Sequence, residues 1–510
     1  MSSIMANLTL QNIREILVES NEAARLVSPF IVAVLVGAVA YRCLTPKAQN
    51  KIHSLGGIPV ITAWKFFSKR YDFLWEHFNR ISEPMFTFKV LHHNVVAVRG
   101  DDARKVFFDS KSLDFTEGYK ILMGAAPRLS EVEIKTDTEG DVTWFNKQLA
   151  HLLNRNRLND MLPSLMEDID RRAQQWGTEG TMDPFQKIYD LVFQMTVRMT
   201  TCRELADDLD AIREMQDLYF TLEKSSTPQA LLLPWFPSRS KRNKDKAVKS
   251  LFVKIYTIVE TRRHATVPTS DAIDVLIAGG YGTHEIVQFV LGVIFAGVLN
   301  TGINACWSIV YVGMHPEWKT KVQKEIDSLI DQNTANSSDA LHKRLSSIPV
   351  SAWEDEMPVF DSIIRETIRL SLTGTALRRN LKEGTSMLGR AIGAGDFLAY
   401  NVGDVHLNPD IYSQPNAFDP SRYGPGREED KKATFAFLGW GAGRHPCTGM
   451  KVAKLEMKVI MAYMLAAFDY KIVDKKGSPL KTLPVPDRND IHQARPIGEP
   501  FFVQFKRIVD

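Results

Sequence analysis

The sequence contains few cysteines and no excess of either charge. Its four cysteines, Cys43, Cys202, Cys306 and Cys447, lie far apart in 510 residues, so no CxxC motif exists. This excludes paired-cysteine zinc and redox sites, argues against a disulfide scaffold, and favours a reducing compartment. The 63 Lys and Arg residues nearly balance 60 Asp and Glu, so charge gives no indication of nucleic-acid binding. A functional cysteine in this chain must act alone.

Internal repeats and low-complexity segments are also absent, and the composition is that of a folded protein. A length rule of about 150 residues per domain suggests about three domains. The periodicity instead predicts one large domain that is mainly α with small β-sheets. Helices are expected over 143–157, 181–202, 206–223, 247–264, 284–314, 316–331, 356–370 and 448–468. Strands are expected over 85–98, within 375–400, and around 501–505.

One uncharged run near the N-terminus approaches the length of a membrane span. Residues 26–41 carry no charge and are flanked by Arg25 and Arg42. As a helix the run would span about 24 Å, against a hydrocarbon core of about 27–30 Å. A cleaved signal peptide or a buried core helix is the alternative. We predict a luminal tail over 1–25, a transmembrane anchor over 26–44, a linker over 45–65, and one large domain over 66–510.

Charges beside this run predict its orientation. Arg42, Lys47 and Lys51 follow it, and the positive side is normally cytoplasmic, so the large domain should face the cytosol. Asn7 would then be a luminal glycosylation site, in the sequence Asn-Leu-Thr. Farther along, the apolar turn 234–237 precedes a basic stretch. It is either a solvated loop or an aromatic tip that enters a membrane surface.

The most informative segment is the glycine-rich loop before the last helix. Gly439, Gly441 and Gly443 allow tight turns and a close approach to a flat ligand. Cys447 follows at the start of a helix, where backbone N–H groups favour a thiolate. Arg444 and the neighbouring His445 can pair with carboxylates. A lone thiolate suits an iron whose other ligands come from a macrocycle. The alternative is a buried structural cysteine.

The pattern Trp440-Gly-x-Gly-x-His-x-Cys447-x-Gly449 resembles the haem-binding loop of cytochromes P450. The resemblance implies haem b (iron protoporphyrin IX) with the Cys447 thiolate as its axial ligand and His445 as a propionate partner. Most members have Phe where Trp440 stands, and the indole ring would still cover the thiolate and offer an N–H toward sulfur. The cofactor-binding residues implied by this loop are Trp440, Gly441, Arg444, His445 and Gly449.

A second set of residues supports the same resemblance. Glu366 and Arg369 share one face of a predicted helix. Downstream, Phe418-Asp-Pro-Ser-Arg422-Tyr423 resembles the second arginine motif of the family, and the segment from His406 to Tyr412 lies between the two. Glu366, Arg369 and Arg422 therefore match the triad that locks the region behind the haem, and we count them with the cofactor-binding residues. The resemblance covers essentially the whole chain and implies the cytochrome P450 fold after an N-terminal anchor.

The segment Phe295–Trp307 resembles the long distal helix of the family, which crosses the oxygen-binding face. Most members carry an acid–threonine pair there. One alignment places Leu299 at the acid and Asn300 at the threonine, as in the sterol 7-alpha and 12-alpha hydroxylase and prostacyclin synthase branch. The other alignment places Asn300 at the acid and Thr301 at the threonine, but Trp307 then falls one residue short of the family pattern, so we prefer the first alignment. Two glycines, at 297 and 302, predict a local bulge.

The implied site residues on the distal side follow from these matches. Asn300 and Thr301 are the candidate catalytic residues. The substrate walls are expected at Ala296, Gly297, Thr373, Thr375 and Ala376.

The resemblance predicts a monooxygenase that uses O2 and a lipophilic substrate. The chain shows no flavin- or nicotinamide-binding segment, so NADPH would act through a separate NADPH–cytochrome P450 reductase, with cytochrome b5 as a further partner, at the endoplasmic reticulum membrane. Lys451, Lys454 and Lys458 are either its docking patch or a solvated helix face.

The sequence of the cysteine loop is similar to that of filamentous-fungal members of the family, many of which modify terpenoids, alkaloids or polyketides. Two other functions stay open. Asn300 suits a hydroperoxide or endoperoxide isomerase that needs no reductase. A non-catalytic haem-binding protein is the other alternative.

Overall fold

The computed structural model describes residues 52–509 except 123–137, 226, 233–235, 237, 266–268, 335, 337 and 491–493. The predicted tail and anchor, together with Asn7, lie outside the described residues. Residues 53–55 and 59–510 form one compact unit, which is mainly helical with small sheets. The predicted fold class is therefore confirmed.

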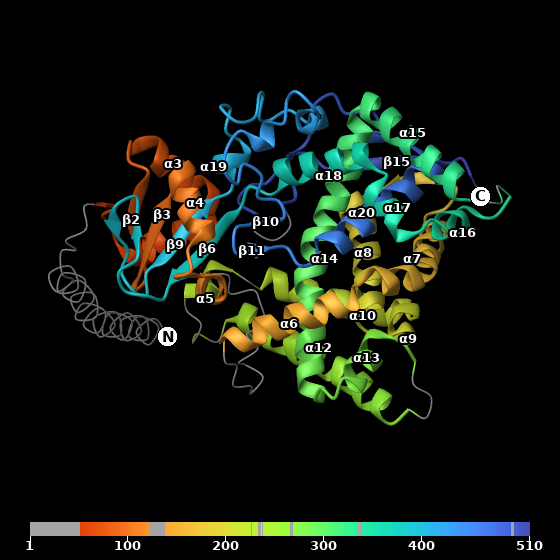
Figure 1. Ribbon diagram of the computed structural model, residues 1–510, viewed down its shortest axis with the longest axis horizontal. Coiled ribbons are helices and arrows are strands. Elements are labelled where there is room, and N and C mark those ends of the chain that lie inside the picture. Colours follow the sequence, from red (N-terminus) through yellow and green to blue (C-terminus); the bar gives the residue numbers. More distant parts are fainter. Residues whose placement is uncertain are drawn as a thin grey trace, which may run out of the picture. The chain divides into compact units, whose positions relative to one another are not determined.

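A six-stranded sheet lies at one end of this unit, beside α3 (Arg70–Arg80) (Figure 1). Its strand order is β1 (His53–Ser54), β2 (Met85–Val90), β3 (His93–Val98), β9 (Phe397–Asn401), β6 (Thr375–Asn380) and β4 (Leu113–Asp114). Phe86, Phe88 and Phe397 on this sheet share a separate apolar cluster with Phe66 of α2 (Pro59–Ser68). The predicted linker over 45–65 is therefore wrong in its second half, because β1 pairs with β2 and α2 is part of the core. The sequence does not distinguish these elements from a linker, because β1 has only two residues and α2 is short and apolar, so neither shows a clear periodic pattern.

The long helices cover the remaining part of the unit. They are α6 (Thr138–Leu152), α7 (Arg155–Trp176), α8 (Pro184–Thr200), α10 (Leu209–Lys224), α12 (Arg239–Arg263), α14 (Thr283–Met314), α15 (Pro316–Asn333), α18 (Pro358–Ser371) and α20 (Met450–Ala467). The predicted helix over 143–157 is divided between α6 and α7. The side chain of Asn154 caps α7 by accepting the N–H of Arg157 at 3.1 Å, which ends one helix and begins the next.

Helix α14 is the central element, and it packs against α8, α12, α18 and α20 (Figure 1). Among the described helices, α14 alone has the length and apolarity to span a membrane. However, 56% of that apolar window is buried within the fold, so its composition reflects a core position. The helix is α-helical from Thr283 to Met314. The expected bulge at Gly297 and Gly302 is therefore wrong.

The C-terminal part adds a three-stranded sheet of β12 (Phe468–Asp474), β15 (Phe501–Arg507) and β5 (Glu179–Met182). Shorter elements are α4 (Asp101–Asp109), α5 (Phe115–Leu122), α9 (Arg203–Asp207), α11 (Pro228–Leu232), α13 (Ala272–Ala278), α16 (Leu341–Ser346), α17 (Val350–Asp355), α19 (Gly403–His406), β7 (Ser386–Met387), β8 (Arg390–Ala391), β10 (Gly441–Ala442), β11 (His445–Pro446), β13 (Val485–Pro486), β14 (Pro496–Ile497), η2 (Pro420–Tyr423) and η3 (Glu429–Lys431).

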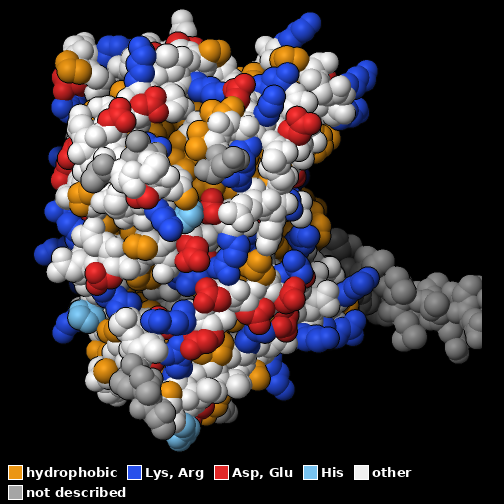
Figure 2. All heavy atoms as spheres, turned by 90° about the vertical axis from the view of Figure 1, so that its right-hand side faces the viewer, with side chains coloured by type: hydrophobic (Ala, Val, Ile, Leu, Met, Phe, Trp, Pro, Cys, Tyr) orange, Lys and Arg blue, Asp and Glu red, His pale blue; other side chains and the backbone are white. Residues whose placement is uncertain are grey.

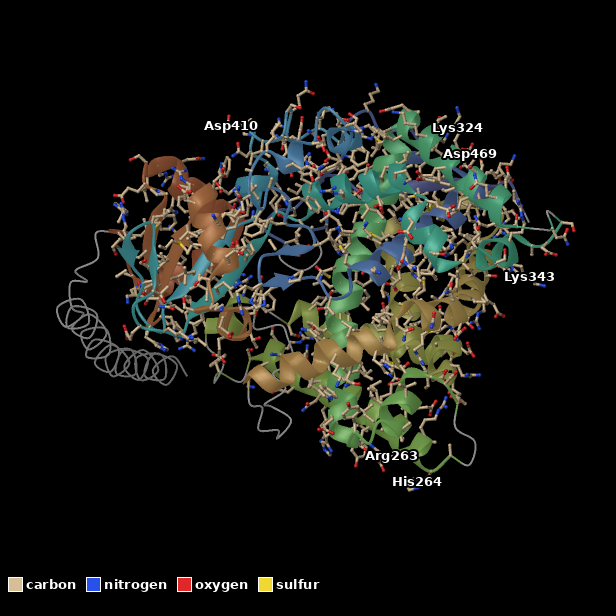
Figure 3. All side chains as sticks on the ribbon, viewed as in Figure 1. Arg263, His264, Lys324, Lys343, Asp410 and Asp469 are labelled. Carbon is tan, nitrogen blue, oxygen red and sulfur yellow. The ribbon has the colours of Figure 1, made fainter. Side chains whose placement is uncertain are left out.

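Charged side chains of both signs are interspersed over the face shown in Figure 2. Lys324, Lys343, Asp410 and Asp469 all lie at the periphery of the unit (Figure 3). This mixture agrees with the balanced composition and shows no large single-sign patch on that face.

Candidate active site

The cysteine loop folds as a tight hairpin of β10 and β11 that packs against α4. The N–H of Gly441 donates to Leu438 O at 3.0 Å, and the N–H of Cys447 donates to Trp440 O at 2.7 Å. Gly441 has φ +71°, and a Cβ there would lie 2.3 Å from His445 O. Gly443 has φ +58°, and a Cβ there would lie 2.3 Å from the carbonyl oxygen of α4 residue 108. Both positions therefore require glycine.

Cys447 lies three residues before α20, and its side chain is exposed. The other two described cysteines, Cys202 and Cys306, are buried, and the Cys306 thiol contacts Pro184 O at 3.2 Å. Surrounding protein atoms raise the pKa of the Cys447 thiol, and the N–H of Gly449 only partly offsets this. The Gly449 N–H acts in the direction expected for the start of a helix, and a positive charge such as a metal ion near the sulfur would further favour the thiolate.

Cationic side chains gather beside this loop. The His445 ring stacks on Phe115 with centroids 5.3 Å apart, and the Arg378 guanidinium lies 4.9 Å from the centroid of the same Phe115 ring. Burial lowers the pKa of His445, and the positive charges of Arg378 and Arg444 add to this effect. The arrangement can receive carboxylates, which would restore the charge balance.

Arg378 is a residue that the sequence analysis missed. It is 3% exposed on β6, and its Nε has no partner among the described residues. Desolvation lowers its pKa, as expected for a buried cation without a bound carboxylate. The sequence offered only the adjacent pair Arg378-Arg379, which does not show which arginine lies at the site. In the structure, Arg379 pairs with Glu117 at 3.1 Å, whereas Arg378 lies beside the cysteine loop.

The structure brings the predicted triad together in a fully buried cluster. Arg369 donates to both Glu366 carboxylate oxygens at 2.8 and 2.7 Å, and Arg422 Nε donates to Glu366 Oε1 at 3.0 Å. Arg369 Nη1 also donates to Pro415 O at 2.7 Å, and Arg422 Nη1 donates to Ser413 O at 2.9 Å. Both carbonyls belong to the irregular segment before the cysteine loop. The triad therefore holds the backbone of the segment that precedes the cysteine loop.

On α14 the predicted distal residues separate into accessible and buried groups. Ala296 and Asn300, one turn apart on one helix face, are exposed, whereas Thr301 is buried. The Asn300 amide donates to Ala296 O at 3.1 Å. Gly297 is partly buried, and a Cβ there would lie 3.5 Å from Thr196 of α8. Accessibility therefore favours Asn300 over Thr301 as a group that meets a ligand.

The expected substrate walls are joined to this helix by hydrogen bonds. Asn304 Nδ2 donates to Asn300 O at 2.7 Å, and Ser371 Oγ donates to Asn304 Oδ1 at 2.7 Å. Ser371 ends α18 just before the segment 373–376, so that segment starts beside the distal helix. Its other end continues along β6 to the cationic cluster at position 378.

Two hydroxyls of this wall have no protein partner. The side-chain oxygens of Thr373 and Thr375 are both buried without a hydrogen bond among the described residues. Ala376, the next wall residue, is buried in β6.

The residues around Cys447 could bind a flat metal complex that carries carboxylate groups. The Trp440 Nε1–H is buried without a partner in the described part of the chain. No described group of three or more His, Cys, Asp or Glu side chains could hold a metal ion. A metal bound through Cys447 must therefore receive its other ligands from a non-protein group. These residues fit an iron porphyrin.

The comparisons with known proteins decide the family. A sequence model described as Cytochrome P450 matches residues 53–484, which is most of the chain. The chain belongs to the cytochrome P450 family. It is thus an oxidoreductase of the monooxygenase type, and the family implies a haem-thiolate cofactor.

Several relatives of this P450 come from fungi. It is 28% identical over 464 residues to cytochrome P450 monooxygenase AacuE of Aspergillus aculeatus, covering 88% of this chain and 92% of the relative. It is 23% identical over 443 residues to a sterol 14-demethylase of Arabidopsis thaliana, covering 81% and 86%. Among solved structures, the retinoic acid-bound cyanobacterial CYP120A1 matches with a TM-score of 0.70 and 18% identity, over 90% of this chain and 99% of that chain. The last match shows the fold.

The lysines predicted as a docking patch of this P450 do not form one surface. Lys458 is buried, donates to Trp353 O at 2.6 Å and pairs with Asp361 at 3.0 Å. Lys454 pairs with the same Asp361 at 3.2 Å, and only the Lys451 side chain is mostly exposed. Lys458 is therefore structural, and the predicted patch is wrong for that residue.

Proposed function

We propose that this P450 is a haem-thiolate monooxygenase that inserts one oxygen atom from O2 into a lipophilic secondary metabolite. The observation that carries the proposal is the exposed Cys447 in a glycine-tightened loop beside the Arg378 and Arg444 guanidinium groups and the His445 imidazole. Trp440 would cover the sulfur, and His445, Arg444 and the neighbouring Arg378 would hold the haem propionates. When bound, haem would supply the redox chemistry, and the Cys447 thiolate would donate electron density to its iron.

On α14, the exposed Asn300 side-chain amide would orient a water molecule or O2. Its N–H already donates to Ala296 O, which fixes the amide plane and leaves Oδ1 as the acceptor. Asn300 has no titratable proton, so a proton must come from water that the amide orients. Thr301 is buried, so we assign this role to Asn300.

The substrate would lie against Ala296, Gly297 and the wall 373–376. This lining is mostly small and apolar, which favours a lipophilic molecule. The unpartnered hydroxyls of Thr373 and Thr375 would recognise one oxygen function on that molecule, since a buried hydroxyl without a partner is costly. The fungal relatives support a terpenoid, alkaloid or polyketide, as fold-level analogy.

Electrons would come from NADPH through a separate NADPH–cytochrome P450 reductase, with cytochrome b5 as a second donor. Lys451, which is mostly exposed near the start of α20, is the lysine of the predicted patch that remains suited to contact an acidic partner.

A location on the endoplasmic reticulum membrane, with the catalytic domain in the cytosol, is also part of the proposal. Helix α2 exposes Val60, Ile61 and Trp64, with Trp64 49% exposed. Helix α11 packs against α2, and Phe236 follows α11 with 42% exposure. These side chains would enter the lipid interface.

Vesicle binding tests this part. Replacing Val60, Ile61 and Trp64 by Ser should reduce binding of the domain without its first 51 residues to phosphatidylcholine–phosphatidylserine vesicles. The matched control replaces Val485 and Ile497, exposed apolar residues of β13 and β14. Equal binding of both variants would contradict the membrane face.

Asn300 also favours a second candidate, a peroxide isomerase of the same fold, because an asparagine at the threonine position occurs in the branch that includes prostacyclin synthase. One assay distinguishes the two. The holoenzyme is given candidate lipids with NADPH and reductase, and separately a lipid hydroperoxide without NADPH. We expect oxygenated product only in the first reaction. Turnover only in the second would favour the isomerase, and Asn300→Ala should retain haem in either case.

A further inference from the structure

His406 of α19 connects two segments on which the active site is built. The N–H of Leu438 donates to His406 Nε2 at 2.9 Å, and His406 Nδ1 is 2.9 Å from Leu372 O. An amide N–H can only donate, so Nε2 must be the acceptor, and Nδ1 must carry the proton that is donated to Leu372. The side chain is completely buried. Burial and the nearby Arg369 charge lower the pKa of His406 to about 3, which keeps this neutral form at physiological pH.

The two hydrogen bonds of the His406 ring reach the backbone of the cysteine loop and the backbone next to the expected substrate wall. Leu438 begins the cysteine loop, and its own carbonyl accepts the N–H of Gly441 at 3.0 Å. Leu372 follows α18 and directly precedes the wall 373–376. The His406 ring thus spans the distance between the loop that presents the thiol and the wall that would contact substrate.

The surroundings hold this ring in one position. The ring of Phe437 stacks on it with centroids 5.5 Å apart and an interplanar angle of 23°. The backbone oxygen of His406 accepts from Arg369 Nη1 at 2.5 Å, so α19 is also fixed to the buried triad. A change to the His406 side chain therefore alters the two ring bonds and leaves the backbone contact with the triad in place.

We propose that His406 is a positioning residue that sets the place of the cysteine loop relative to the substrate wall. The inference rests on the proposed haem-thiolate function, because it assigns His406 a role in holding the thiolate at its ligation distance. Each ring nitrogen has a separate task. Nε2 holds the cysteine loop, and Nδ1 holds the wall.

Two variants separate these tasks. In His406→Asn the amide nitrogen replaces Nδ1 and keeps the bond to Leu372 O, but nothing accepts the Leu438 N–H. In His406→Gln the amide oxygen reaches the position of Nε2 and keeps the Leu438 bond, while the Leu372 bond is lost. His315→Asn is the matched control. It also removes a ring that contacts a backbone carbonyl, at Tyr311 O (2.7 Å), and packs against an aromatic ring, Phe418.

The experiment uses the purified holoenzyme and two spectroscopic readouts. The first is the fraction of the reduced carbon-monoxide complex that shows the thiolate-ligated Soret band. The second is the dissociation constant of imidazole, which probes the distal side. His406→Asn should lower the thiolate fraction several-fold with little effect on imidazole. His406→Gln should retain the thiolate fraction and change imidazole affinity several-fold. His315→Asn should change neither.

Each outcome decides the inference. Wild-type levels of both readouts in both His406 variants would overturn it, as would losses equal to those of His315→Asn. If one variant fails to fold, the other variant decides the inference, because only one of its two readouts should change. A wild-type enzyme without the thiolate band would instead refute the proposed haem-thiolate function itself.

Discussion

The backbone N–H of Cys447 donates to the carbonyl oxygen of Trp440 at 2.7 Å. This bond closes the loop across seven residues and brings the backbone of the tryptophan to that of the cysteine. The Trp440 indole N–H has no partner among the described residues, although it is buried. We infer that the loop positions the Trp440 indole N–H to donate to the Cys447 sulfur. Such a hydrogen bond would affect the haem reduction potential.

Trp440→Phe should make the haem reduction potential more negative. Removing a hydrogen bond to the axial sulfur leaves more negative charge on it, which favours the ferric state. Spectroelectrochemical titration measures the shift. Trp353→Phe is the control, because Trp353 is also buried with an unpartnered indole N–H but belongs to α17. Equal potentials in wild type and Trp440→Phe would show that the indole does not donate to sulfur.

Gly443→Ala should prevent a stable fold of the cysteine loop. The added Cβ would meet the carbonyl oxygen of Phe108 at 2.3 Å, and φ is +58°. The expected loss of stability is at least about 1–3 kcal/mol. Thermal unfolding and haem content measure it. Gly449→Ala is the comparison, since a Cβ there has no atom within 4 Å, and its protein fold should persist. Similar unfolding temperatures for both variants would contradict the steric argument.

Glu366→Gln should strongly destabilise the P450. It leaves the buried Arg369 and Arg422 guanidinium groups without their shared carboxylate, and breaking such a buried pair costs about 3–5 kcal/mol. Urea unfolding of the holoenzyme gives the value. In contrast, Arg213→Ala removes an exposed ion pair with Asp210 and should have little effect. A loss no larger than that of Arg213→Ala would refute the structural role of the triad.

Glu456→Gln should remove one pH dependence of stability. Burial in α20 raises the pKa of Glu456 from 4.5 to about 8, and a hydrogen bond from Thr196 Oγ1 at 3.4 Å only partly offsets this. Between these pH values the folded chain keeps a proton that the unfolded chain has released. Stability therefore falls as pH rises from about 4.5 to about 8, on the order of 1 kcal/mol per pH unit from this group.

Denaturant midpoints measured over that pH range test this prediction. The Gln variant should gain stability relative to wild type as pH increases. Parallel curves for the two proteins would mean that Glu456 is ionised in the folded state.

Much of the fold could be predicted because its long helices carry a regular apolar pattern. The segments later found as α14, α15 and α20 were predicted close to their ends. The boundary near residue 59 was missed, since α2 exposes apolar side chains on one side and buries Phe66 and Phe67 on the other. Such a helix has little polar face, so its amphipathic pattern is weak.

For the site, adjacent residues were predicted more readily than residues that meet only in three dimensions. The loop from Trp440 to Cys447 is continuous in sequence, and its glycines indicated the tight turn. Arg378 and His406 were missed as site residues because their importance depends on burial and on partners far along the chain. Likewise, the burial of Lys458 and Thr301 is a property of packing, which a list of residue types does not contain.

The central claim is that Cys447 is the axial ligand of haem iron. The most direct measurement is the absorbance spectrum of the dithionite-reduced, carbon-monoxide-treated holoenzyme, compared with the Cys447→Ser variant. We predict the red-shifted Soret band of thiolate ligation in wild type and its loss in the variant, while Cys202→Ser and Cys306→Ser retain it. A wild-type spectrum without this band, or an unchanged band in Cys447→Ser, would contradict the account.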